Sequence, residues 1–292
     1  MPNSTQRPPP NARHLAVILD GEAPPAGAGA SADAIFRARV AAHGERVRRL
    51  KAEGASRFVE NRDLAAFTAQ GGALPDLVLV GDNPGRREWE NSVYLCVAGR
   101  AGAMAHRFFD VIYGEGSFRS KVMVLNKSSF HTPRTADLAQ FLRDTPENRG
   151  LAEAIRTDQR ENARLLADIV ALLGVPVVTI GMESGGTVFQ TFRQTLESRY
   201  RELAKPGAVF RGRTLADPFR KVPHFSLSKI FCRNADAAWN AGLDSFLGRH
   251  EGAIPGLRTS NGNISSKILL SVGGERVLSD YLATVIIGTG KS

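Results

Sequence analysis

At residues 77–85 the sequence is LVLVGDNPG, so that four apolar residues lead directly into Gly81, Asp82, Asn83 and Pro84. An Asn amide both donates and accepts hydrogen bonds, and an ionised carboxylate accepts them, so this group could hold a polar ligand. The alternative is a turn that ends a strand. In such a turn Asn and Asp bond to local amides, Pro fixes φ, and Gly adopts a left-handed conformation. Taken alone, the motif favours the turn.

A second polar group follows the apolar segment 121–126. Asn126 ends that segment and opens the stretch NKSSFHTPRT at 126–135. Its amide carries a donor and an acceptor, which is the combination that reads the edge of a base. The alternative is an Asx-turn that begins a loop. We expect His131 to cap this loop rather than to act in catalysis.

A third polar group lies in VPHFSLSK at 222–229, where His224 precedes Ser226, Ser228 and Lys229. A His side chain can donate to a carbonyl oxygen that gains negative charge. Hydroxyl groups and a Lys ammonium can hold phosphates. A lone His is more often structural, but the two Ser and the Lys close behind it favour a binding role.

Short apolar runs alternate with helical patterns along the chain. The apolar runs predict strands at 77–81, 121–126 and 176–181, with a candidate fourth strand at 224–229; the helical spacing predicts helices at 34–51, 101–113, 135–142, 161–174, 185–196 and 234–248. Such alternation indicates an α/β fold whose sheet is covered by helices on both faces. Ligands bind these sheets beyond the carboxyl ends of the strands, where the polar groups above fall.

The composition is that of an ordinary globular protein, with 292 residues of which 42% are hydrophobic and 23% charged. This length fits one large domain, which we place at 33–250. Segment 1–32 is expected to be disordered because it is rich in Pro, Asn and Arg at 1–13 and in Ala, Gly and Pro at 22–32. Residues 251–292 form an extension of uncertain structure. No run approaches the ~18 apolar residues of a membrane span, and the N-terminus lacks an apolar signal core, so we expect a cytoplasmic protein with no membrane partner.

The charge balance favours an acidic partner. A formal net charge of +9 and a pI near 10.0 point to nucleic acid first. The alternative is a basic protein that does not bind nucleic acid. Only Cys96 and Cys232 are present. Two thiols cannot form a four-cysteine cluster, and a cytosolic setting argues against a structural disulfide.

Together these residues resemble the uracil-DNA glycosylase superfamily. GDNPG at 81–85 is close to the G-x-N-P-G motif of its mismatch-specific and single-strand-selective branches, and H-x-S at 224–226 resembles its H-P-S motif. Asn126 after a strand, and an Ile-Gly strand end at 180–181 before a helix, complete the set. The four elements occur in the same order and with similar spacing as in the family, over residues 75–248.

The resemblance implies a three-layer α/β/α fold with a central, mainly parallel four-stranded sheet. It implies a hydrolase of base excision repair, which cleaves the N-glycosidic bond of uracil or a related deaminated or damaged base in DNA and leaves an abasic site. No cofactor is needed, and the two cysteines exclude the iron–sulfur cluster that some branches carry. We therefore expect a monomer that associates with the nucleoid by binding DNA.

The resemblance also implies roles for single residues. Asn83 would position the attacking water, Asn126 would read the polar edge of the base, and His224 would donate to the base carbonyl oxygen. Glu88 lies where some branches have an acidic residue, and we assign it no chemistry. The remaining site residues divide into those expected at the base, Gly81, Asp82, Pro84 and Tyr94, and those expected at the DNA backbone, Ser226, Ser228, Lys229, Lys127 and Ser128.

Several positions depart from the family pattern. The most efficient branches have Asp where this chain has Asn83, and an amide cannot accept a proton as a carboxylate does, so catalysis should be slower unless Asp82 contributes. Phe225 stands where the family has Pro, which leaves Leu227 as the candidate wedge between bases. Tyr94 is the expected stacking residue because a flipped base needs a ring on which to stack.

A basic, aromatic stretch follows the first motif. Arg86, Arg87 and Trp89 either contact DNA or are solvated.

Two other functions remain open. A protein of the same fold could bind a base or an abasic site without cleaving it, which Asn83 and the altered last motif favour. A nucleotide or phosphate-sugar enzyme on a generic α/β sheet would need a phosphate-binding loop. GTGKS at 288–292 lacks the G-x-x-x-x-G-K-[ST] spacing and has no following helix.

Overall fold

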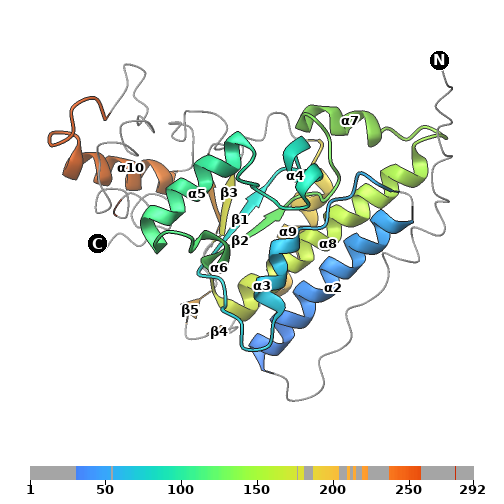
Figure 1. The fold of residues 1–292 in the computed structure, drawn as a ribbon, viewed down its shortest axis with the longest axis horizontal. Helices are drawn as coiled ribbons and strands as arrows, with labels where there is room; N and C mark the ends of the chain where they lie inside the picture. The colour runs from blue at the N-terminus through green and yellow to red at the C-terminus, as the bar shows by residue number, and fades with distance from the viewer. Residues whose placement is uncertain are drawn as a thin grey trace.

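The computed structural model describes most of the chain between residues 31 and 257 (Figure 1). The described ranges are 31–53, 55–175, 177–180, 187–203, 209–210, 213–214, 219–222, 237–257 and residue 280.

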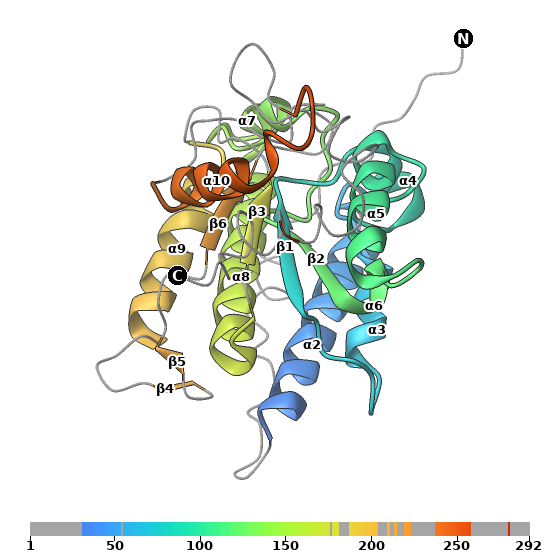
Figure 2. The same ribbon diagram turned by 90° about the vertical axis from the view of Figure 1, so that its left-hand side faces the viewer.

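The centre of the molecule is a parallel sheet (Figures 1 and 2). Its strands are β1 (Leu77–Gly81), β2 (Val122–Asn126), β3 (Val177–Ile180) and β6 (Phe219–Val222), in the order β2-β1-β3-β6. Every residue of β1 and β2 is buried, which explains why both strands are continuous apolar runs rather than alternating ones. The expected mixed α/β class is confirmed.

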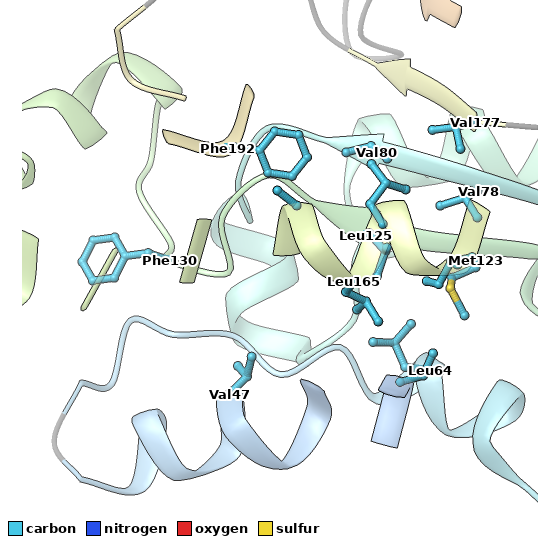
Figure 3. Packing of buried hydrophobic residues seen from close by; sticks show 14 of the residues in the cluster. Val47, Leu64, Val78, Val80, Met123, Leu125, Phe130, Leu165, Val177 and Phe192 are labelled. Atoms are coloured by element: carbon cyan, nitrogen blue, oxygen red, sulfur yellow. The ribbon is translucent and has the colours of Figure 1, made fainter. Parts of the chain in front are cut away.

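Two long helices pack beside each other against one face of this sheet, α2 (Ala32–Ala52) and α8 (Arg149–Leu173). Figure 3 shows the core between them and the strands. Val78 and Val80 point into this cluster, whereas Leu77 and Leu79 are buried on the opposite face, as the alternation of side chains along a strand requires.

Shorter elements complete the fold. These are α3 (Ala65–Thr68), α4 (Arg86–Asn91), α5 (Arg100–Tyr113), α6 (Phe118–Lys121), α7 (Leu138–Phe141), α9 (Gln190–Leu203) and α10 (Ala237–His250), the 3-10 turns η1 (Arg62–Leu64) and η2 (Thr135–Asp137), and the antiparallel pair β4 (Val209–Phe210) and β5 (Arg213–Thr214). None of the helices in the described ranges is long and apolar enough to cross a membrane.

The predicted elements are found with four corrections. Helix α8 begins at Arg149 instead of near residue 161, and α9 begins at Gln190 instead of near 185. The segment 135–142 is a 3-10 turn followed by one helical turn. The strand that pairs with β3 is 219–222, which precedes the expected 224–229; the latter lies outside the described residues.

The early start of α8 has a clear physical reason. Thr157, Asp158 and Gln159 are polar yet buried, so the apolar spacing that predicts a helix is interrupted there. At the other end, Gly174 adopts φ 65° and closes the helix, as predicted.

The expected N-terminal boundary of the domain, between residues 32 and 33, differs slightly from the structure. Ser31 is the N-cap of α2, and its hydroxyl accepts from the amide of Ala34 at 3.2 Å, so 31–32 belong to a helix rather than to the expected disordered segment. Residues 1–30 lie outside the described part of the chain, as does most of the extension at 251–292.

Candidate functional site at the carboxyl edge of the sheet

The first two polar motifs lie side by side because their strands are neighbours. Gly81, the last residue of β1, pairs with Asn126, the last residue of β2. The pairing continues beyond the strands, where the amide of Lys127 donates to Gly81 O at 2.9 Å and that of Ser128 to Asp82 O at 3.1 Å. The carboxyl edge of the sheet therefore holds the GDNPG turn and the loop 126–132 together.

Gly81 is needed at this edge because the Asn126 side chain covers it. A Cβ at Gly81 would lie 2.4 Å from Asn126 Oδ1. Asn126 itself is buried, and its Nδ2 has no hydrogen-bond partner among the residues that the structure describes. An unpaired buried donor is destabilising by about 1–3 kcal/mol, so Asn126 presents a donor that an acceptor on a ligand would satisfy.

Asn83 is held by the facing loop. Its Nδ2 donates to Phe130 O at 3.3 Å and to Thr132 Oγ1 at 2.8 Å. The Thr132 hydroxyl donates in turn to Arg134 O at 2.8 Å, so its proton is committed elsewhere. Asn83 Oδ1 is buried and accepts no hydrogen bond within the described ranges. The fixed amide thus leaves an unpaired acceptor at the same edge of the sheet as the unpaired donor of Asn126.

His131 joins the two loops, as expected for a structural residue. Its Nδ1 lies 2.8 Å from Pro84 O and donates to it, and its ring stacks on that of Trp89 with centroids 5.0 Å apart. Burial lowers the pKa of His131. The ring is therefore neutral near pH 7 and fastens the GDNPG turn to loop 126–132.

Asp82 does not present a free carboxylate. Its Oδ1 accepts from Lys127 Nζ at 2.7 Å, and Lys127 is only 1% exposed. The same ammonium lies 5.1 Å from the centre of the Phe189 ring. Two expectations change as a result, because Lys127 points inward and cannot reach a DNA phosphate in this conformation, and Asp82 is neutralised by it.

Ser128 is also internal, against its expected place at the DNA backbone. It is 0% exposed, and its hydroxyl donates to Asp158 Oδ2 at 3.2 Å. The amide of Ser129 donates to the same oxygen at 2.6 Å. These two hydrogen bonds therefore fix loop 126–132 to the Asp158 carboxylate of α8.

That carboxylate belongs to a buried polar network of His43, Arg46, Asp158 and Asn162 beneath the loop. Arg46 Nη2 lies 3.3 Å from Asp158 Oδ1 and donates to Asn162 Oδ1 at 2.8 Å. Asn162 Nδ2 donates to Asn126 O at 3.2 Å. Burial raises the pKa of Asp158 and lowers that of Arg46. The network therefore fixes the backbone of Asn126.

Sequence reasoning missed these four residues. The signal available was the polar set 157–159 and Asn162 on what proves to be a buried face of α8. A polar residue in a stretch whose neighbours pack into a core must find partners there. For Asp158 and Asn162 those partners are Arg46 on α2 and the loop 126–132, both distant in the sequence, and only the fold reveals them.

Tyr94 does not lie where the resemblance would put a stacking ring. It is 1% exposed, its hydroxyl donates to Val59 O at 2.9 Å, and its amide donates to Asn61 Oδ1 at 3.2 Å. Burial raises the pKa of its hydroxyl. Both ring faces are enclosed in this structure, so Tyr94 is a core residue that supports the turn after α4.

Glu88 has a positioning role in the turn. Its Oε2 accepts from the amide of Gly85 at 2.5 Å, and its Oε1 accepts from the amide of Leu95. Burial raises its pKa. Leu95 has a positive φ of 47°, which is unfavourable for a side chain of this kind. The carboxylate therefore ties the end of the GDNPG turn to a strained backbone position.

The third motif cannot be placed. His224, Ser226, Ser228 and Lys229, with the candidate wedge Leu227, lie outside the described residues. Strand β6 ends at Val222, which pairs with Ile180 at the carboxyl end of β3. Strand β6 therefore ends at the same edge of the sheet that carries Asn83 and Asn126.

Comparison with protein-family models, with curated proteins and with solved structures gave no match for this chain. The site is therefore interpreted from its own geometry. In the described part of the chain, no three His, Cys, Asp or Glu side chains come together as ligands for a metal ion.

The network makes stability depend on pH through His43. Its Nδ1 lies 3.0 Å from Arg46 Nη2, which can only donate, so the ring accepts and is neutral. Burial, and then the charge of Arg46, lower the pKa of His43 well below its usual value. The unfolded chain takes up this proton near about pH 6.5 and the folded protein does not, so stability is complete above that pH and is lost below it. Between about pH 7.5 and 5.5, His43 should remove about 1.4 kcal/mol from the free energy of unfolding.

Urea unfolding of the wild type and of His43→Gln at these two pH values measures the effect. Gln keeps an acceptor for Arg46 but does not titrate, so its loss of stability on acidification should be smaller by that amount. Equal losses in the two proteins would show that His43 is protonated as readily in the folded state as in the unfolded one.

Proposed function

We propose that this protein is a DNA glycosylase, which hydrolyses the N-glycosidic bond of uracil or a related deaminated base in DNA and leaves an abasic site. One observation carries the proposal. At the ends of two neighbouring parallel strands, Asn83 Oδ1 and Asn126 Nδ2 are buried and lack partners among the described residues. They offer an acceptor and a donor, which suits a water on one side and a base carbonyl on the other.

The reaction needs this combination. The target nucleotide must leave the base stack, at a cost of a few kcal/mol that is smallest for an unpaired base. As the bond between sugar and base breaks, negative charge gathers on the base, and a donor fixed near its carbonyl stabilises the transition state. The bond between sugar and base breaks with its electron pair left on the base. A water whose hydrogen is held by Asn83 Oδ1 forms the new bond to the sugar carbon, and the proton that it loses passes through solvent water to the base anion.

The rest of the proposal follows the resemblance to the uracil-DNA glycosylase superfamily. It comprises that family's three-layer fold with a four-stranded sheet and the roles of the remaining site residues. Backbone groups of Gly81 and Pro84 would face the base. His224 would donate to a base carbonyl oxygen, and Ser226, Ser228 and Lys229 would hold phosphates. The net charge of +9 supports an acidic substrate. Such an enzyme would act in base excision repair in the cytoplasm, on the nucleoid.

The alternative is a binding protein of the same fold that recognises a base or an abasic site without cleaving it. One observation favours it: the carboxylate nearest to Asn83 in sequence, Asp82, is neutralised by Lys127 at 2.7 Å. The turn then contains no free carboxylate that could accept a proton from water, so only a slow reaction or none is expected from it.

A panel of end-labelled oligonucleotides tests the proposal. Each contains one uracil, hypoxanthine or xanthine, in single- and double-stranded form, or one mispaired thymine in a duplex. Each is treated with hot alkali after incubation to break abasic sites. A cleaved band for one of these bases would establish a glycosylase and identify its substrate. No band on any strand, with a retained mobility shift, would favour the binding protein; neither a band nor a shift would reject both.

Gly81→Ala should disturb the candidate site while the protein remains folded. The new Cβ would displace the Asn126 amide, whose Oδ1 lies 2.4 Å from its position. We expect base release to slow at least about 10-fold, with the free energy of unfolding lowered by about 1–3 kcal/mol. Gly44→Ala on α2 is the matched control, because nothing lies within 4 Å of its Cβ, and activity should be unchanged. Full activity of Gly81→Ala would show that Asn126 is not part of the site.

A further inference from the structure

Trp89 is an exposed aromatic side chain beside the candidate site. In the part of the chain that the structure describes, the exposed large apolar residues are Trp89, at 38% exposed, and Val97, at 62%. Helix α4, which carries Trp89, begins directly after the GDNPG turn (Figure 1). An exposed indole next to a ligand-binding edge is a feature that folding does not require.

The indole is held in place before any ligand arrives. One ring face stacks on His131, with an angle of 7° between the ring planes, and Nε1 donates to Ser56 O at 3.0 Å. The exposed area of the ring therefore lies on its other face and outer edge. Because His131 also donates to Pro84 O, two contacts connect the indole to the residue beside Asn83.

Three exposed arginines lie close to Trp89 or to its hydrogen-bond partner in the sequence. Arg86 and Arg87 share helix α4 with Trp89, and their side chains are 78% and 63% exposed. Arg57 follows Ser56 in the sequence and is also exposed, with its guanidinium over the Phe141 ring. Glu90 is the carboxylate that pairs with Arg86 and Arg87. Surface pairs of this kind are weak and exchange readily for other anions. A flat apolar face on a helix that also carries two exposed arginines is complementary to a base on a phosphate backbone.

We propose that Trp89 stacks on an unpaired base of single-stranded DNA, next to the nucleotide whose base reaches Asn83 and Asn126. The inference rests on the proposed function and specifies its substrate, since in a duplex the neighbouring bases are paired and stacked on each other. Stacking on an aromatic side chain is sequence-tolerant, because every base has a flat face. Trp89 thus contributes affinity for single strands without selecting the damaged base.

Fluorescence titration tests this directly. Trp89 and Trp239 are the two tryptophans of the chain, so Trp239→Phe leaves Trp89 as the only indole. The probes are a 12-nucleotide thymidine strand, a strand of equal length with the same sugar-phosphate backbone but no bases, and a blunt duplex. The thymidine strand should quench Trp89 strongly, and the other two should quench it weakly. Equal quenching by the baseless strand or the duplex would overturn the inference.

Affinity measurements supply the second arm. Trp89→Ala should weaken binding of the thymidine strand about 10- to 100-fold and leave binding of the baseless strand unchanged. Val97→Ala, at the other exposed apolar residue, is the matched control and should change neither. Thermal unfolding checks that Trp89→Ala is folded, and Trp89→Phe, which keeps a ring, should recover part of the affinity.

The outcomes separate this inference from the proposed function. None of the probes contains a damaged base, so the titration does not depend on cleavage. Tight binding that is insensitive to Trp89→Ala would overturn the inference alone, whatever the cleavage panel shows. A protein that bound none of the three probes would overturn the inference, and the cleavage panel would still decide the proposed function.

Discussion

Replacing Asn83 with Ala should lower the single-turnover rate of base release by at least about 100-fold, with little change in DNA affinity. The amide is fixed by Phe130 O and Thr132 Oγ1, and its Oδ1 is the acceptor that would orient the attacking water. Ala removes that acceptor. Binding should survive because phosphate contacts, which supply most of the affinity for DNA, lie elsewhere.

The measurement is a single-turnover cleavage assay on the best substrate of the oligonucleotide panel, with affinity from a gel shift. Asn91→Ala is the matched control, because Asn91 is an exposed Asn on α4 whose Nδ2 donates to Arg87 O. It should cleave at the wild-type rate. If Asn83→Ala also did so, Asn83 would not hold the water, and the assignment of the motif would be wrong.

Asn83→Asp should not speed up base release, although the most efficient branches of the uracil-DNA glycosylase superfamily, which this chain resembles, have Asp at the matching position. A carboxylate cannot donate to Phe130 O, which the amide now does at 3.3 Å, and the Thr132 proton is already donated to Arg134 O. Two acceptors would face each other, at a cost of about 1–3 kcal/mol in the free energy of unfolding. The hydrogen-bond partners around residue 83 therefore suit an amide better than a carboxylate.

Arg46→Met should lower the free energy of unfolding by about 3–5 kcal/mol, the largest effect on stability that we expect. The Arg46 guanidinium faces Asp158, which is 0% exposed, at 3.3 Å. Removing the guanidinium leaves a buried carboxyl without its counter-charge and Asn162 Oδ1 without its donor. Met retains most of the apolar stem, so the loss reports on the charge and its hydrogen bonds.

Urea unfolding of three further proteins identifies the cause. Arg48 lies two residues after Arg46 on α2 and forms surface ion pairs with Glu45 and Glu60. Arg48→Met should therefore change the free energy of unfolding by less than about 1 kcal/mol. Asp158→Asn and the double variant Arg46→Met/Asp158→Asn complete a double-mutant cycle. The double variant should be more stable than Arg46→Met, because its residue 158 carries no charge. Additive losses would show that the two groups are not coupled.

The sequence by itself determined the class of the fold and the location of two polar motifs. Leu77–Val80 and Val122–Leu125 are continuous apolar runs, and such runs between helices specify strands buried on both faces. Asn83 and Asn126 follow those runs, so their place at the carboxyl edge of a parallel sheet could be predicted. These conclusions depend on local patterns, which a sequence displays directly.

The tertiary structure alone decided how the polar side chains are paired. Lys127 could have faced DNA, yet it turns inward to Asp82, and Tyr94 could have lined a pocket, yet it is enclosed in the core. The counter-charge of Asp158 is Arg46 on α2, more than a hundred positions away in the sequence. Whether a charged or aromatic side chain is exposed depends on what packs over it, and the packing joins segments that are distant in the chain. That is why the place of Asn83 and Asn126 at the sheet edge was predictable, and the network beneath them was not.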